Sequence, residues 1–415
     1  RDTSVTGVQT CALPICLVMY STNEQFLLTT DSDVLSPTSA KVNSLSTYEC
    51  DPNLEAVSIG TNQTFVSKTP LYTRVFELGE ITADQPPVLT DITNIVPELI
   101  PETADSMISS SVLSIVSLGQ IGTNRVYQYR FLMKNRSERA LSSWYQWDLL
   151  GQLQCQFFDG GTYYAVTRNN DGDNNTTDDF YVQAFDMSQA SESGFLTLPT
   201  GERTDVCLDL FTINPHRTYN STTDQTRIFL PYDTVPGREF VVLLLGGFIG
   251  DTATNTTESL GSVLTPTIEG AQGARRVDIN GDYRGRDLII GYRYDMQVDL
   301  PKFYRFSAEQ GQISNDDVSS LVVHRIKVKT GLCGPIDYRI SITGLEDWTN
   351  TVEVTRPNQY ELNNVNMQAS STHVVPIYQR NENLAISIIG NTPFPVSLLG
   401  VDWEGKLNQR FYRRG

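Results

Sequence analysis

The feature of this sequence that most constrains its fold is a two-residue alternation of apolar and polar side chains. In the segment 127–131, YQYRF, three aromatic side chains alternate with a glutamine and an arginine. Comparable alternation recurs at 322–329, 338–343 and 384–388. Successive side chains of a β-strand point to opposite faces, so this pattern is typical of strands with one buried face. We therefore predict a mainly β protein with little helix.

The expected strands fall into sets that turn-rich connections separate. Sets of about four antiparallel strands, each returning beside the last, are how β-propeller blades are built, although a β-sandwich gives similar spacing. We predict one set at 111–118, 125–133, 143–149 and 153–158, and a second at 162–167, 180–185 and 205–211. The sequence thus favours partial β-propeller-like blades over residues 17–225, with a domain change near Asn220–Gln225. A β-rich domain of the sandwich or platform type is expected over residues 226–415.

Two connections carry predictions of their own. In residues 91–111, Asp91 is a residue type that caps helices, whereas Pro97 and Pro101 prevent one long helix. We expect a linker with one or two helical turns there. The segment 330–335, TGLCGP, suits a tight reversal, and we expect it to join its flanking strands in an antiparallel hairpin.

Residues 1–16, RDTSVTGVQTCALPIC, have neither the basic start nor the continuous apolar segment of a signal peptide. The phrase VQTCALPI resembles a translated sequencing adapter. We interpret residues 1–16 as adapter-derived, with native sequence beginning near Leu17 and the natural protein extending further upstream. The alternative is an ordinary chain terminus.

Composition disfavours two classes of protein. The formal net charge is −17, and specific binding to nucleic acid is disfavoured because phosphate contacts rely on lysine and arginine. The longest apolar run, residues 240–249, is about half as long as a membrane span and contains two glycines, so it is expected to be a buried strand. Four cysteines lie beyond residue 16 without metal-site or disulfide-scaffold spacing, and we expect buried or partly buried thiols at Cys50, Cys155, Cys207 and Cys333.

Two acidic clusters resemble cation-binding loops only in part. They comprise Asp171, Asp173, Asn175 and Asp178 in one segment, and Asp278, Asn280 and Asp282 in another. Neither has the glycine at the sixth position or the closing glutamate of a calcium loop. We expect solvated turns, with Gly281 supplying a positive φ in the second, and leave a bound cation as the alternative.

Other polar motifs favour structural roles. The histidines have no partner at metal spacing, and we expect ordinary structural roles for His216, His324 and His373. Asn-x-Ser/Thr sequons are readily produced by chance in a chain so rich in these residues, and they occur at Asn62, Asn135, Asn174, Asn175, Asn220 and Asn255. No local nucleophile, metal or phosphate-loop motif is present, so we predict no catalytic residue, no cofactor and no metal site.

The last residues, 403–415, combine aromatic and basic side chains at the end of an acidic chain. Aromatic residues and arginine are enriched at protein interfaces. We therefore predict an ordered or interfacial role for Trp403, Arg410, Phe411, Tyr412, Arg413 and Arg414. A frayed polar tail is the alternative.

A series of motifs in the second half resembles one viral family. VPIYQRNEN at 375–383, TPFP at 392–395 and the WEG…FYRR ending look like the C-terminus of the nozzle protein, or tail tubular protein B, of short-tailed phages. VHRIKVK at 323–329 and DYRISITG at 337–344 resemble its penultimate strands. The similarity runs from about residue 17 to the end and is strongest in the final hundred residues.

The resemblance implies a structural virion protein and not an enzyme. It implies a homo-hexameric tube with propeller-like and platform regions, which docks on an adaptor ring (tail tubular protein A) and helps to hold the tail fibre protein. Phage DNA would pass through the lumen without sequence-specific binding, and the tail would assemble in the host cytoplasm. A propeller-type glycan-binding or glycan-hydrolysing protein is the main alternative, and a secreted glycoprotein is a third. Without its upstream strands the chain is expected to be poorly soluble or to associate irregularly.

Overall fold

The structure is a computed structural model of the 415-residue chain. It describes residues 9–12, 17–30, 36, 39–60, 62–79, 88–134, 139–169, 179–187, 195–197, 203–234, 238–248, 261–268, 275–304, 306–309, 312–315, 320–352 and 370–408. Within these ranges the regular structure is antiparallel β-strand apart from one short 3-10 helix, Asn381–Asn383. The predicted fold class, mainly β with little helix, is confirmed. The chain divides into two compact units, Arg1–Ser191 and Glu192–Gly415.

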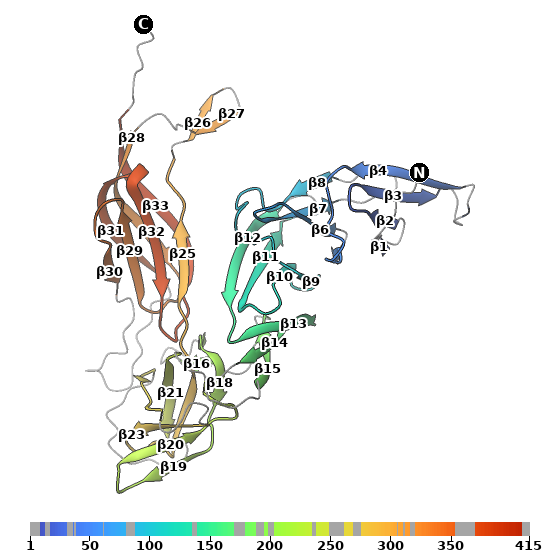
Figure 1. Cartoon of the computed structure of the whole chain (residues 1–415). Coiled ribbons are helices and arrows are strands. Elements are labelled where there is room, and N and C mark those ends of the chain that lie inside the picture. Colours follow the sequence, from blue (N-terminus) through green and yellow to red (C-terminus); the bar gives the residue numbers. More distant parts are fainter. Residues whose placement is uncertain are drawn as a thin grey trace. The chain divides into compact units, whose positions relative to one another are not determined.

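The described residues of the first unit form four sheets, and each is a meander in which strands pair in chain order (Figure 1). Sheet 1 consists of β1 (Gln9–Ala12), β2 (Leu17–Tyr20), β3 (Gln25–Thr30) and β4 (Ala40–Ser46). Sheet 2 consists of β5 (Val57–Ile59), β6 (Asn62–Lys68), β7 (Thr73–Gly79) and β8 (Val88–Asp91). Sheet 3 consists of β9 (Ser106–Ser110), β10 (Ile115–Gly119), β11 (Arg125–Met133) and β12 (Arg139–Asp148). Sheet 4 consists of β13 (Gln152–Asp159), β14 (Thr162–Asn169) and β15 (Asp179–Asp186).

Consecutive sheets of this unit enclose separate apolar cores. In sheet 2, Phe65 packs toward sheet 1 while the next residue, Val66, packs toward sheet 3. Sheet 3 likewise uses Tyr129 toward sheet 2 and Val126 toward sheet 4. The two middle sheets are therefore buried on both faces, as the blades of a β-propeller are. The predicted partial β-propeller-like domain is confirmed.

Buried polar contacts also cross each of these three interfaces. Between sheets 1 and 2, the Tyr20 hydroxyl donates to the Gln63 Oε1 at 2.7 Å. Between sheets 2 and 3, the Arg139 guanidinium pairs with the carboxylate of Glu77. Between sheets 3 and 4, the Ser117 hydroxyl donates to the side chain of Gln156 at 2.9 Å. Because a buried polar group needs a partner, these contacts fix how each sheet meets the next.

The predicted grouping of strands was wrong by one strand. Sheet 3 begins with β9 at Ser106–Ser110, and β13 at Gln152–Asp159, expected to end that set, begins sheet 4. The expected strand at 205–211 instead becomes parts of β17 (Arg203–Asp205) and β18 (Asp209–Ile213) in the second unit. The sequence of β9, SMISS, has no clear alternation, so the pattern of residues 106–110 does not distinguish this strand from the preceding linker.

The linker expected in residues 91–111 contains isolated hydrogen-bonded turns and no regular helix. The Val96 amide donates to the Thr93 carbonyl at 2.9 Å, and the Leu99 amide donates to the Val96 carbonyl at 3.1 Å. These isolated turns do not continue as a helix because Pro97 and Pro101 have no amide hydrogen to donate.

The second unit begins with small sheets. One sheet pairs β16 (Phe195–Thr197) with β17. A second has the order β18, β24 (Arg286–Tyr292), β21 (Phe240–Phe248), β22 (Val263–Leu264). A third has the order β19 (Arg217–Asn220), β20 (Gln225–Phe229), β23 (Arg276–Asn280). Strands β16, β21 and β24 contribute Leu196, Leu243 and Ile289 to a shared apolar core. Strand β21 contains the long apolar run, and Val241 and Leu243 are buried in the core, as predicted. The expected domain change at Asn220–Gln225 lies within this unit, where these two residues are paired at the end of the β19–β20 hairpin.

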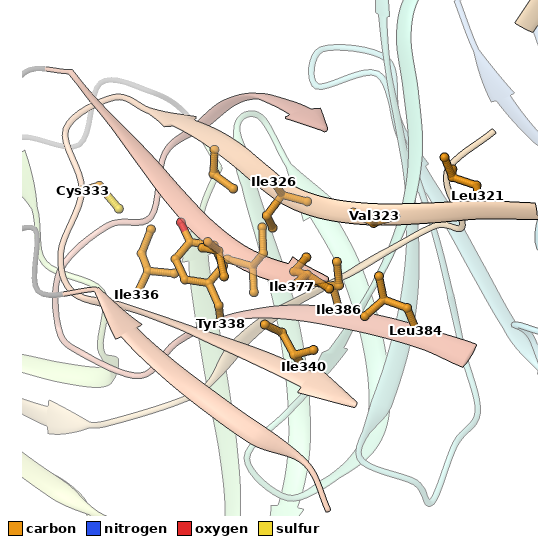
Figure 2. Packing of buried hydrophobic residues seen from close by; sticks show 13 residues of the cluster. Leu321, Val323, Ile326, Cys333, Ile336, Tyr338, Ile340, Ile377, Leu384 and Ile386 are labelled. Atoms are coloured by element: carbon orange, nitrogen blue, oxygen red, sulfur yellow. The ribbon is translucent and has the colours of Figure 1, made fainter. Parts of the chain in front are cut away.

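The C-terminal part is a β-sandwich. One sheet has the order β25 (Met296–Leu300), β32 (Leu384–Gly390), β29 (Ile336–Ile342), β30 (Trp348–Val352), and the other has the order β31 (Ser371–Arg380), β28 (Ser320–Thr330), β33 (Leu398–Asn408). Figure 2 shows Ile326 and Ile377 of one sheet in a shared core with Ile340 and Ile386 of the other. A short hairpin, β26 (Phe306–Glu309) and β27 (Gln312–Asn315), precedes β28.

The hairpin expected around TGLCGP at 330–335 was wrong. Strand β28 pairs with β31 and β33, whereas β29 pairs with β30 and β32, so the segment crosses from one sheet to the other. Its glycines are needed for close approach, since a Cβ on Gly334 would lie 2.6 Å from the Phe394 Cβ. Both strands have alternating patterns because both face the same core from opposite sides (Figure 2).

Candidate assembly surfaces

The outer face of sheet 4 is an exposed apolar surface. The cross-strand register places Phe157, Tyr164 and Ala184 in one row, and Cys155, Val166 and Val182 in the next. Phe180 extends the surface on β15. Phe180 is 62% exposed and Val182 66% exposed, and the Phe157 and Tyr164 rings stack with centroids 5.0 Å apart. We call these residues of β13–β15 the sheet 4 face.

Sheet 1, at the other end of the series, has a second apolar face. Its register aligns Met19 with Phe26, and Leu28 with Leu17 and Val42. Val42 is exposed and the other four side chains are partly exposed. We call these residues of β2–β4 the sheet 1 face.

Contiguous exposed apolar patches on a protein mark interaction sites. Both faces have the composition of the faces that sheets 2 and 3 bury. Alternation of apolar and polar residues does not reveal such faces, but β15 contains FYVQAF, which places apolar residues on both faces of the strand.

Of the residues predicted to form a C-terminal interface, only Trp403 lies in the described part of the chain. Trp403 lies in β33, is partly buried against the sandwich core, and has its ring centroid 5.8 Å from that of Phe303. Its contacts are those of a packing residue. The other predicted residues, Arg410, Phe411, Tyr412, Arg413 and Arg414, lie outside the described residues, so their interfacial role stays a prediction.

Ion pairs connect β28 with β33 on the outer face of the β31–β28–β33 sheet. Glu404 of β33 pairs with both Arg325 and Lys327 of β28, and Asp402 pairs with Lys329 at 2.9 Å. Hydrogen bonds from Lys327 and then Arg325 lower the pKa of the Glu404 carboxyl. The charges are matched across strands, which keeps this face hydrated and specifies register rather than adding much stability.

The acidic cluster at 278–282 is only partly the solvated turn that was expected, because Asp282 lies in the connection after β23 whereas Asp278 lies within β23. Asp278 is buried and pairs with Arg227 at 2.8 Å, while a hydrogen bond from Arg284 lowers the pKa of Asp282. Gly281 has φ +103°, as predicted. Residues 171–178 lie outside the described part of the chain. Across the part that is described, no group of three His, Cys, Asp or Glu side chains is placed to hold a metal ion.

Buried titratable groups belong to the folded core. His373 bonds the Tyr338 hydroxyl at 2.9 Å and the Ser371 hydroxyl at 2.7 Å, and burial lowers its pKa. This is the structural role predicted for it. Burial raises the pKa of Asp209 to about 6, against the opposing effect of Arg238.

The cysteines correct one prediction. Cys50 and Cys333 are buried and Cys207 is partly buried, as expected, and all are free thiols. Cys155 is exposed on the sheet 4 face, so the prediction was wrong there. Alternation alone does not say which face of a strand is covered. No helix within the described ranges is long and apolar enough to cross a membrane.

Comparison with known proteins identifies the family. A sequence profile described as bacteriophage nozzle protein matches residues 11–414. The chain belongs to the bacteriophage nozzle protein family. It is therefore a structural component of a phage tail, as the motifs near the C-terminus predicted. A search of curated proteins finds no match.

Solved structures with similarity to the chain include glycosidases, at low similarity. An exo-β-1,3-galactanase from Phanerochaete chrysosporium shares 10% identity with a TM-score of 0.23, covering 97% of this chain and 98% of the galactanase. A fructofuranosidase from Schwanniomyces occidentalis shares 8% identity with a TM-score of 0.23, covering 99% of this chain and 97% of that one. At these TM-scores the similarity supports no inference about fold or activity.

Proposed function

We propose that this chain is a wall-forming subunit of a short phage tail, assembled as a homo-hexameric tube through which the genome leaves the particle. The observation that carries the proposal is the family match over residues 11–414. The two exposed apolar faces on a rigid β scaffold support self-association, because such faces are unfavourable in an isolated subunit.

The negative net charge of the chain is compatible with a channel through which DNA passes. Its net charge is −17, and a ring of acidic subunits repels the phosphates of DNA over roughly 10 Å at physiological salt. Each phosphate held by lysine or arginine would slow passage of the duplex. DNA is thus a passing cargo here and not a bound ligand.

The proposed partners follow from a position at the end of a tail. The tube docks on the adaptor ring, tail tubular protein A, and helps to hold the tail fibre protein, after assembly in the bacterial host cytoplasm. The C-terminal residues Arg410, Phe411, Tyr412, Arg413 and Arg414 are the proposed contact with one of these partners.

The test is the composition of particles of the phage that encodes the chain. Quantitative mass spectrometry should find it at the copy number of a single hexameric ring, and gold-labelled antibody should mark the tail. Absence from purified particles, or labelling spread over the capsid, would contradict the proposal. Deleting residues 410–415 should release the partner that they contact while leaving the sandwich folded by circular dichroism.

A further inference from the structure

Strand β18, at the edge of its sheet in the second unit, is anchored differently at its two ends. At the C-terminal end, the Asn214 amide donates to the Leu288 carbonyl at 2.8 Å, and the Asn214 Oδ1 accepts from the Leu288 amide at 2.9 Å. The Asn214 Nδ2 also donates to the Asp287 carboxylate at 2.8 Å. Asn214 has φ +45°, a left-handed conformation that asparagine tolerates. This end of β18 is therefore firmly attached to β24.

The N-terminal end of β18 is a strained β-bulge. Between its paired residues Asp209 and Thr212, two residues of β18 lie opposite the single residue Gly291 of β24. One of the two, Leu210, has φ +45°, which is unfavourable for a bulky side chain. A Cβ on Gly291 would lie 2.9 Å from the Asp209 carbonyl oxygen, so the bulge packs directly on the backbone of β24. This end is held in place against a local preference of the chain.

The same end of β18 adjoins the contact between the small sheets and the sandwich. The Cys207 amide donates to the carbonyl of Pro393, in the connection between β32 and β33, at 2.8 Å. Leu208 and Phe394, from the same two segments, are buried in one apolar core. Asp209 lies between this contact and the bulge, so a displacement of its side chain disturbs both.

The Asp209 carboxyl group lies where its charged form is unfavourable. The residue is partly buried, and within the described ranges no hydrogen bond or ion pair reaches its carboxylate. Burial raises its pKa to about 6, although the nearby Arg238 guanidinium acts in the opposite direction. A partly buried carboxylate without hydrogen bonds is stabilised by any opening that lets water reach it.

The other titratable groups around the bulge are uncharged at neutral pH or are paired. Thiols and phenols ionise well above pH 7, and these groups are Cys207, Tyr232, Tyr292 and Tyr294. Burial raises the pKa further at Cys207, Tyr232 and Tyr294. Arg293 and Glu239 form an ion pair with one another, and Asp205 is exposed. Among the described groups at this end of β18, Asp209 is thus the one whose charge changes between pH 5 and pH 7.

We propose that residues 206–210 form a proton-sensitive latch between the small sheets and the sandwich, closed while Asp209 is protonated and loosened when it is charged. Asn214 is the fixed end about which β18 loosens. Opening hydrates the carboxylate and relieves the left-handed conformation of Leu210. Because the pKa of Asp209 is raised in the folded chain, the latch weakens as the pH rises through about 6. The latch is a property of the single chain and is independent of the proposed tail ring.

Hydrogen exchange with mass spectrometry on the 415-residue chain at pH 5 and pH 7 tests the latch. The Cys207 amide, bonded to Pro393, reports on the latch, and the Asn214 amide, bonded to Leu288, reports on the fixed end. After correction for intrinsic exchange rates, protection at Cys207 should be about tenfold lower at pH 7, the ratio expected when a carboxyl pKa of about 6 returns to 3.8 on opening. Protection at Asn214 should be the same at both pH values.

Three variants assign the effect to Asp209. Asp209→Asn should abolish the pH dependence at Cys207, whereas Asp205→Asn, which neutralises an exposed acid in β17, should preserve it. Arg238→Gln should enlarge the fall in protection, because the charged carboxylate then lacks its opposing cation, and it serves as a second test should Asp209→Asn fold poorly. Equal protection at Cys207 at both pH values in the unsubstituted chain would overturn the proposal. A fall that persists in Asp209→Asn, or one equally large at Asn214, would do the same.

Discussion

Removing the guanidinium of Arg139 should destabilise the first unit more than removing any surface cation. Arg139 of β12 pairs with Glu77 of β7, bonds the Tyr129 hydroxyl at 2.8 Å and lies 4.3 Å above the Phe131 ring. The Glu77 side chain is 6% exposed and that of Arg139 is 23% exposed. In the variant Arg139→Met, the Glu77 carboxylate keeps one hydrogen bond, from Asn62 at 2.6 Å.

The magnitude follows from this geometry. Removing one partner of a fully buried pair costs about 3 to 5 kcal/mol. The remaining bond from Asn62 and the partial exposure of Arg139 reduce this cost, so we expect a loss of about 2 to 3 kcal/mol in the free energy of unfolding. Adding Glu77→Gln to the Arg139→Met variant removes the unpaired buried charge. About half of the lost free energy of unfolding should be recovered, because a neutral amide costs less to bury than a carboxylate.

Hydrogen exchange with mass spectrometry is the suitable assay, because it separates the first unit from the second. Peptides covering β7 and β12 should lose protection while those of the sandwich should not. The matched control is Arg125→Met in the same sheet. The Arg125–Asp148 pair has side chains 45% and 44% exposed, so its loss should cost under about 1 kcal/mol. Equal effects of the two arginine variants, or no rescue by Glu77→Gln, would refute the reasoning.

Three further predictions concern other parts of the chain. Asp209→Asn should stabilise the second unit at pH 7 by about 1 to 2 kcal/mol and have little effect at pH 4. The sign follows because the folded pKa is raised to about 6, so deprotonating the folded state above that pH is unfavourable; equal effects in urea melts at both pH values would contradict it. Gly334→Ala should cost about 1 to 3 kcal/mol, since its Cβ would meet the Phe394 Cβ, whereas Gly400→Ala in β33 has open space and should cost far less, as thermal melts would show. Lysine replacement of acids that line the tube should slow genome release in fluorescence ejection assays, and unchanged kinetics would remove the proposed role of the acidic wall.

Local pattern was enough for many of the strands. Residues 127–131 and 338–342 alternate cleanly and lie in β11 and β29, because a strand with one buried face needs no distant information to be recognised. The family could be predicted for a different reason, since several motifs follow in order near the C-terminus and the profile match covers the same region.

The candidate site was only partly predictable. A turn was correctly predicted at Gly281 and Asp282, but Asp278 is a buried residue of β23, and its pairing with Arg227 joins residues whose proximity is set by the sheet. The aromatic and basic tail was visible in the sequence, whereas the exposed faces of sheets 1 and 4 were not. A face is open or covered according to which sheet comes next, and no single strand contains that information.

By itself, the sequence determined that the chain would form short antiparallel strands, carry a strong negative charge and resemble a phage tail component. Only the tertiary structure decided which strands pair. Strands β28 and β29, which residues 330–335 connect, lie in opposite sheets of the sandwich, and β9 is the first strand of sheet 3. The physical reason is that alternation shows only that one face of a strand is buried. The partner strand and the covering sheet are chosen by packing between residues far apart in the chain.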